Sequence, residues 1–193
     1  MMLACPFVKD GEEGISTPSA CVEGAGHILA EMLAENAEIR QRLRQVFGEK
    51  GLLRSTVREE KKEAKESLRF KPYFDFKEPI AKIPSHRLLA LRRGEKEDVL
   101  TVKLDVDREK LVPELVARVP IHPSSGYKPY LHAVAEDAFD RLLAPSIEVE
   151  VRMEAKRKAD LEAIKVFQTN LDHLLLAPPA APGAGGRGWS GRP

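Results

Sequence analysis

Three glycines near the end of the sequence have the spacing of a phosphate-binding motif. Gly183, Gly185 and Gly188 satisfy the G-x-G-x-x-G pattern, whose backbone amides cradle a dinucleotide phosphate when a strand precedes the pattern and a helix follows it. Here a Pro-rich stretch precedes the glycines, and the residues after them read Trp-Ser-Gly-Arg-Pro. Because both flanking elements are missing, we expect no nucleotide site at these glycines.

The histidines and cysteines carry no metal or nucleophile signature. The histidines are His27, His86, His122, His132 and His173. No two of them are four residues apart, the spacing that puts two zinc ligands on one helix face. Cys5 and Cys21 are the only thiols, too few for a zinc cluster or a secreted disulfide framework. We therefore expect a cytoplasmic protein that is not an enzyme and binds neither cofactor nor metal.

Basic side chains gather in residues 40–71, which hold eleven bases and five acids. The whole chain has 31 Lys and Arg against 30 Asp and Glu, which excludes a histone-like protein. Clustered cations release counterions from nucleic acid, so this segment predicts weak, sequence-independent binding of RNA or DNA. The candidate residues are Arg40, Arg44, Lys50, Arg54, Arg58, Lys61 and Lys62. Because glutamates interrupt the run, an alternative is favoured in which these are solvated faces that bind nothing.

The elements that must position these residues follow from hydrophobic periodicity. It predicts a mainly α fold: a multi-helix domain with one or two short β-strands and a long C-terminal helix. The first helix is expected over residues 18–47, with Thr17 as its cap and Gly48 and Gly51 at its end. Other expected helices cover 58–70, 86–93, part of 108–118, and 128–143. Strands are expected at 52–57 and 99–106, with loops around the prolines at 72, 79 and 84 and at 120–126.

The longest expected helix begins at Pro145 and meets no breaker before Leu176. Its predicted buried face consists of Ile147, Val151, Leu161, Ile164, Phe167, Leu171 and Leu174. If that face is buried, Phe167→Ala costs about 3–5 kcal/mol. Charge pairs four residues apart, such as Glu148 with Arg152, are expected on the outside of the helix.

The two ends differ from this domain, which we place at residues 18–176. Residues 1–17 are expected to be an irregular leader. Residues 177–193 hold nine Pro or Gly in seventeen positions, a composition that predicts a disordered tail. No apolar run reaches the length of a membrane span and no secretory signal is present, so no membrane contact is expected.

One stretch is distinctive enough to indicate a family. Residues 73–94 read YFDFKEPIAKIPSHRLLALRRG, which resembles the YFDxxEPxxxIPSHRxLAxxRG block of bacterial transcription accessory proteins of the Tex type. Further similar blocks are ILAE at 28–31, Gly51-x-Leu53-x-Ser55, RLLAPSIE at 141–148, AIKVF at 163–167, Asn170-Leu171, and LLLAPP at 174–179. The resemblance covers roughly residues 4–179.

The resemblance implies an internal or truncated fragment of the helical N-terminal part of an RNA-binding transcription protein. The family's nuclease-like domain, helix-hairpin-helix motifs and OB-fold RNA-binding domain would follow the LLLAPP block. Its implied partners are RNA or DNA and the transcription or ribosomal machinery. Within the named block, Ser85 is expected to cap a helix, Arg87 to reach a carboxylate, and His86 to be packed or hydrogen-bonded. No catalytic role is carried over. The alternative is a protein-interaction or spacer module without nucleic-acid contact.

Overall fold

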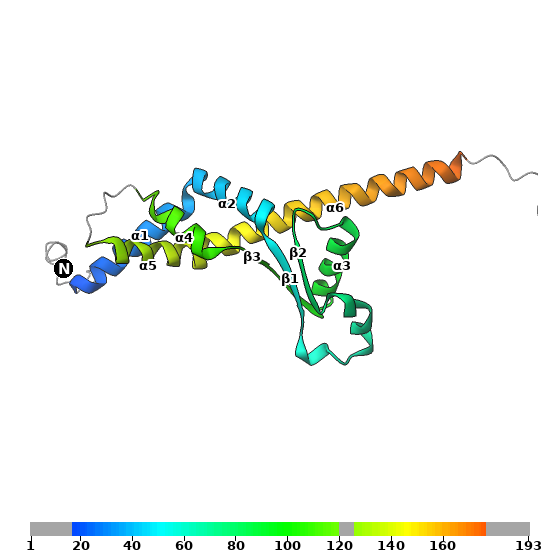
Figure 1. Ribbon diagram of the computed structural model, residues 1–193, viewed down its shortest axis with the longest axis horizontal. Helices are drawn as coiled ribbons and strands as arrows, with labels where there is room; N and C mark the ends of the chain where they lie inside the picture. The colour runs from blue at the N-terminus through cyan, green and yellow to red at the C-terminus, as the bar shows by residue number, and fades with distance from the viewer. Residues whose placement is uncertain (1–16, 120–125, 177–193) are drawn as a thin grey trace, which may run out of the picture.

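The computed structural model describes residues 17–119 and 126–176. Figure 1 shows a long helical rod with a bundle of helices at one end and a small sheet projecting from its middle as an arm. The fold is mainly α, as predicted. The predictions for residues 1–16, the loop at 120–125, the tail at 177–193 and the three glycines within it lie outside the described residues.

The expected first helix is two helices, α1 (Pro18–Glu35) and α2 (Ala37–Lys50), because Asn36 interrupts it. The Asn36 side-chain oxygen accepts hydrogen bonds from the amides of Glu38 (3.0 Å) and Ile39 (3.1 Å), so this residue caps a new helix. The Thr17 cap is confirmed by its bond from the Ala20 amide, 3.2 Å long. Gly48 lies inside α2 and does not end it.

The sheet contains three antiparallel strands in the order β2-β1-β3: β1 (Leu52–Val57), β2 (Asp75–Pro79) and β3 (Leu100–Asp105). β1 and β3 match the two predicted strands. β2 was expected to be a loop, and that expectation is wrong. Proline is tolerated in β2 because it is an edge strand and Pro79 is its last residue. At Gly51, which ends α2, an added Cβ would lie 2.2 Å from the Phe47 carbonyl oxygen, so only glycine fits.

The arm is completed by α3 (Ser85–Lys96) and by short 3-10 turns at Glu59–Lys61 and Lys65–Tyr73. These turns replace the helix expected over 58–70. The buried Ser67 hydroxyl donates to carbonyl oxygens within the same segment, which stabilises the turns. α3 passes through Gly94, where the sequence predicted its end. A Cβ at Gly94 would lie 2.6 Å from Leu100 Cδ1, so this glycine permits close packing of α3 on β3.

The rod is a continuous helical path rather than two separate helices. α5 (Lys128–Asp137) leads through a π-helical turn (Ala138–Leu143) into α6 (Ala144–Leu175). Pro145 was expected to begin a new helix, but the chain stays helical through it. The π-turn stands where Pro145 removes a backbone donor and crowds the preceding turn. α4 (Arg108–Val116) packs on α5.

One core runs through the bundle and the arm. Between α2 and the rod, the rings of Phe47 and Phe139 lie 6.4 Å apart, and Leu143 and Ile147 are fully buried. In the arm, Leu91 of α3 and Leu100 of β3 are buried together with Leu53 of β1. The first half of α6 therefore packs against both α2 and α3.

Candidate functional site

Two of the predicted nucleic-acid-binding cations face the rod. Arg40 and Arg44 lie on one face of α2, and both pair with Glu150 of α6. Arg40 also donates to Ser146 Oγ at 3.2 Å and to the Ala34 carbonyl at 3.3 Å. The Arg44 and Arg40 guanidiniums hold the pKa of Glu150 below its usual range. Both arginines thus connect α2 to α6.

The other predicted cations are dispersed over β1, the turn after it and the end of α2. Arg54 lies 3.9 Å from Asp105, Arg58 lies 2.9 Å from Asp98, and Lys61 lies 3.7 Å from the same carboxylate. Lys62 lies 3.5 Å from Glu59. Lys50 is exposed and has no ion pair among the described residues. Six of the seven candidates therefore have a carboxylate partner.

Arg42 of α2 pairs with Glu114 of α4 at 3.1 Å. At the start of α3, two expectations are corrected and one is confirmed. Ser85 makes no capping bond, and its hydroxyl donates to Glu162 of α6 instead. His86 is exposed rather than packed. The expectation that Arg87 reaches a carboxylate is confirmed, because it pairs with Glu78 at 3.2 Å.

Arg152 connects α6 to two elements of the arm, α3 and β3. Its guanidinium donates to both oxygens of Glu95 in α3, each at 2.7 Å, and to the Val102 carbonyl of β3 at 3.1 Å. Glu148 accepts from Arg152 at 3.3 Å and from the Leu104 amide at 3.1 Å. The expected Glu148–Arg152 pair exists, but it lies inward: the Arg152 side chain is 14% exposed. Together these bonds cover the outer edge of β3.

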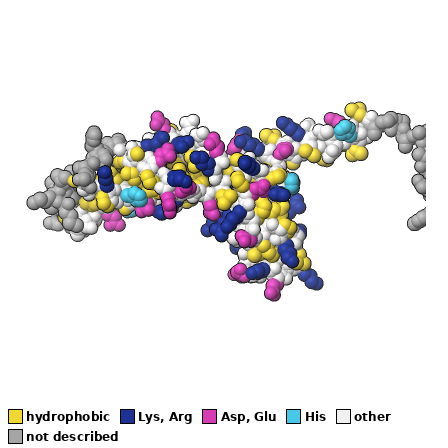
Figure 2. Space-filling model, in the orientation of Figure 1, with side chains coloured by type: hydrophobic (Ala, Val, Ile, Leu, Met, Phe, Trp, Pro, Cys, Tyr) yellow, Lys and Arg dark blue, Asp and Glu magenta, His cyan; other side chains and the backbone are white. Residues whose placement is uncertain are grey.

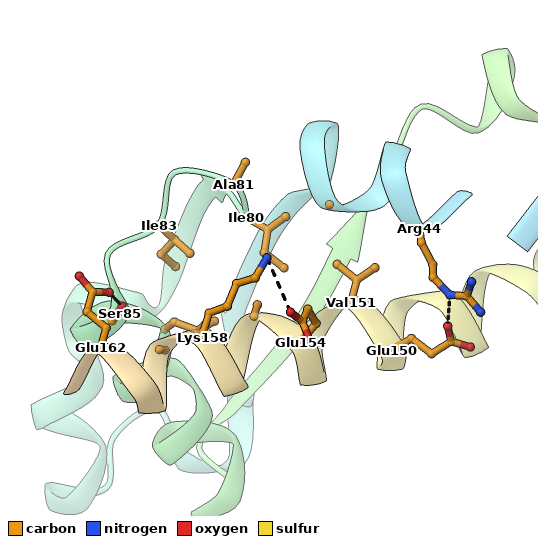
Figure 3. Close-up of a pocket in the computed structure, with 14 residues that line it drawn as sticks. Arg44, Ile80, Ala81, Ile83, Ser85, Glu150, Val151, Glu154, Lys158 and Glu162 are labelled. Carbon is orange, nitrogen blue, oxygen red and sulfur yellow. Dashed lines mark hydrogen bonds and ion pairs between the residues drawn. The ribbon is translucent and has the colours of Figure 1, made fainter. Parts of the chain in front are cut away.

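A groove of about 400 Å³ lies between the end of α2, the loop before α3, and α6. Figure 3 shows apolar side chains such as Ile80, Ile83 and Val151 lining it, with Arg44, Glu154, Lys158 and Glu162 at its margins. Lys158 lies 3.8 Å from Glu154, and the Arg157 guanidinium lowers the pKa of Glu154. The charges at the groove therefore pair with one another.

The far half of α6 has an exposed apolar face, here called the distal face: Leu161, Ile164, Phe167, Leu171 and Leu174. All five were expected to be buried, and that expectation is wrong. Their exposed fractions run from 41% for Leu171 to 75% for Leu174. Only Ile147 of the predicted stripe is fully buried, and Val151 is half-buried. The reason is visible in Figure 1: α6 continues past the arm, where no other described element accompanies it.

Two classes of site are absent from residues 17–119 and 126–176. They hold no group of three or more His, Cys, Asp or Glu side chains placed to bind a metal ion. None of the helices in these two ranges is long and apolar enough to cross a membrane. The ion pairs, the groove and the distal face are the candidate surfaces of this part of the chain.

Comparison with known proteins assigns the chain to a family. The family model described as Tex central region-like matches residues 1–167. The chain belongs to the Tex family. The sheet arm, α5 and α6 as far as Phe167 lie within the matched residues, as does the YFDFKEP…IPSHR stretch.

Three relatives show how much of a Tex-type protein the chain represents. It is 34% identical to the protein YdcI of Bacillus subtilis over 87% of the chain, and 34% identical to the transcriptional accessory protein Tex of Neisseria gonorrhoeae, again over 87%. It is 30% identical to the human S1 RNA-binding domain-containing protein 1 over 90% of the chain. The chain spans 23% of each bacterial relative and 18% of the human one.

Proposed function

We propose that this chain is a helical scaffold within a Tex-type transcription accessory protein. In this proposal α6 holds the sheet arm with its first half. It presents the distal face to an apolar helix from the remaining part of the longer protein. The observation that carries the proposal is the exposure of the distal face on a helix whose other half is tightly packed.

The spacing of the distal face favours a helical partner. Ile164, Phe167, Leu171 and Leu174 follow one another at steps of three, four and three residues. This alternation places apolar side chains along one seam, as in helices that pack knobs into holes. The relatives are several times longer than the chain, and this further length supplies candidate helices. An apolar surface of this kind drives association when it is left open.

Sedimentation velocity at increasing protein concentration tests the scaffold proposal. We expect the chain to self-associate, because two copies can cover each other's distal faces. The double variant Phe167→Glu, Leu171→Glu should remain monomeric while keeping the far-UV circular dichroism of the parent. The matched control is Ile28→Glu, Met32→Glu on α1, which changes two exposed apolar residues elsewhere and should associate like the parent. A parent chain that stays monomeric at every concentration would contradict the proposal.

We propose in addition that the chain makes at most weak, sequence-independent contact with RNA or DNA. Two relatives support this through their names, one as a transcriptional accessory protein and one as an S1 RNA-binding domain-containing protein. In this proposal the full-length protein makes the contact with the transcription or ribosomal machinery. Fluorescence anisotropy with two unrelated RNA sequences and their DNA counterparts should give similar, salt-sensitive binding.

A spacer module without nucleic-acid contact is the second candidate. It is favoured by the pairing of six of the seven predicted cations with carboxylates, since a paired cation is less available to phosphate. Anisotropy that stays flat up to high micromolar protein at 50 mM salt would select this candidate. The same result would remove the nucleic-acid proposal and leave the scaffold proposal unaffected.

A further inference from the structure

The sheet carries a row of three cations, of which only Arg54 belongs to the basic segment 40–71. In the strand register, Arg54 of β1 stands directly opposite Lys77 of β2 on one side and Lys103 of β3 on the other. Residues directly opposite one another in neighbouring strands point to the same face, and strands are about 4.8 Å apart. The three side chains therefore form one line across the whole sheet, here called the cationic row.

The cationic row is on the open face of the sheet. Arg54, Lys77 and Lys103 are all exposed, whereas their strand neighbours Leu53, Val102 and Leu104 are buried on the α3 side. Figure 2 shows basic side chains gathered over β1 and β3 at the base of the arm. Like charges directly opposite in a sheet are destabilising. A row of three cations therefore destabilises the fold, and a bound anion would offset the repulsion.

Two carboxylates and two hydroxyls share this face with the row. Asp105 lies 3.9 Å from Arg54, and Asp75 stands opposite Thr56, one row away. Lys77 and Lys103 have no ion pair among the described residues. Thr56 and Thr101 stand opposite each other beside the row, and threonine hydroxyls donate to phosphate oxygens. Two unpaired lysines, an arginine and adjacent hydroxyls suit a chain of phosphates.

We propose that the cationic row binds the phosphate backbone of a nucleic acid strand laid across the sheet. Neither the six residues of the two adjacent rows nor the row itself includes an aromatic side chain for stacking, so the bases are not read. The contact is electrostatic and blind to sequence. This inference rests on the nucleic-acid part of the proposed function. Of the seven candidate cations it keeps only Arg54, and it adds Lys77 and Lys103 on the same face of the sheet.

The test uses the full 193-residue chain and a fluorescein-labelled single-stranded RNA of mixed sequence, with anisotropy read at 50 and 200 mM salt. Three phosphate contacts weaken binding about 20-fold over this range, and one contact about 3-fold. We expect the parent to show at least the larger change. The variant Lys77→Gln, Lys103→Gln should bind more weakly at 50 mM salt. Because it keeps one of three contacts, its loss of affinity between 50 and 200 mM salt should fall from about 20-fold to about 3-fold.

Two control variants remove the same charge elsewhere. Lys128→Gln, Lys165→Gln changes exposed lysines of α5 and α6, and Lys50→Gln, Lys62→Gln changes the basic segment; both should keep the parent's salt dependence. A row variant that binds like the parent overturns the inference but leaves the nucleic-acid proposal standing. A parent that does not bind overturns both. Polyglutamate that competes as well as unlabelled RNA also overturns the inference, because it would identify the ligand as an acidic polypeptide. Circular dichroism confirms that each variant is folded.

Discussion

In both halves of α6, apolar residues recur at the spacing of one helix face. Only the first half is packed against other described elements. In the first half, Ile147 is fully buried and Arg152 binds both α3 and β3. In the second half, Phe167 is 66% exposed and the other side chains of the distal face are also exposed. Helix periodicity shows which residues share a face, but burial depends on what lies opposite that face. The first half stabilises the fold, and the second is available to a partner.

Truncating one apolar side chain in each half should give the largest contrast. Ile147→Ala should lower the free energy of unfolding by about 2–5 kcal/mol, because it leaves a cavity in the core. Phe167→Ala should change it by less than about 0.5 kcal/mol, as for other surface substitutions, and not by the 3–5 kcal/mol that the sequence predicted. Urea melts at a concentration where the chain is monomeric measure both. Equal losses for the two variants would erase the distinction between the halves.

Removing a partly buried and an exposed arginine of α6 should give the next largest contrast. Arg152→Ala should destabilise the chain by about 1.5–3 kcal/mol, because Glu95 and the Val102 carbonyl lose a charged donor. Arg157→Ala is the matched control. Its side chain is 72% exposed and pairs only with Glu154 among the described residues, so its loss should be within about 0.5 kcal/mol. If Arg152→Ala left the free energy of unfolding unchanged, the arm would be held by apolar packing alone.

The ion pair between α2 and α6 should give the smallest effect, and a pH-dependent one. The pKa of Glu150 is lowered by Arg44 and Arg40, so the carboxylate stabilises the fold above its unfolded pKa, near 4.5. This stabilisation is lost as the pH falls through the lower folded pKa. Because the pair is half-exposed, the loss should be below about 1 kcal/mol. Urea midpoints between pH 6 and about 3 should fall less in Glu150→Gln than in the parent; identical curves would show that the pair contributes nothing.

Sequence reasoning succeeded where the signal was local. Alternation marked β3, Thr17 and Pro18 marked the start of α1, and the named block indicated the family. It failed where distant residues decide the outcome. Gly94 permits contact with Leu100 instead of ending a helix. Arg40 and Arg44 are held by Glu150, more than a hundred positions away. The cationic row depends on strand register, and β2 itself was not predicted.

Amide hydrogen exchange along α6 distinguishes a helix with one half in the folded core from a helix that is protected along its whole length. It is measured at a concentration where the chain is monomeric, so that self-association does not protect the distal face. We predict that amides of residues 147–159 exchange only through global unfolding, while those of residues 163–175 exchange at least about a hundredfold faster through local opening. Uniform protection from Ile147 to Leu175 would contradict the account.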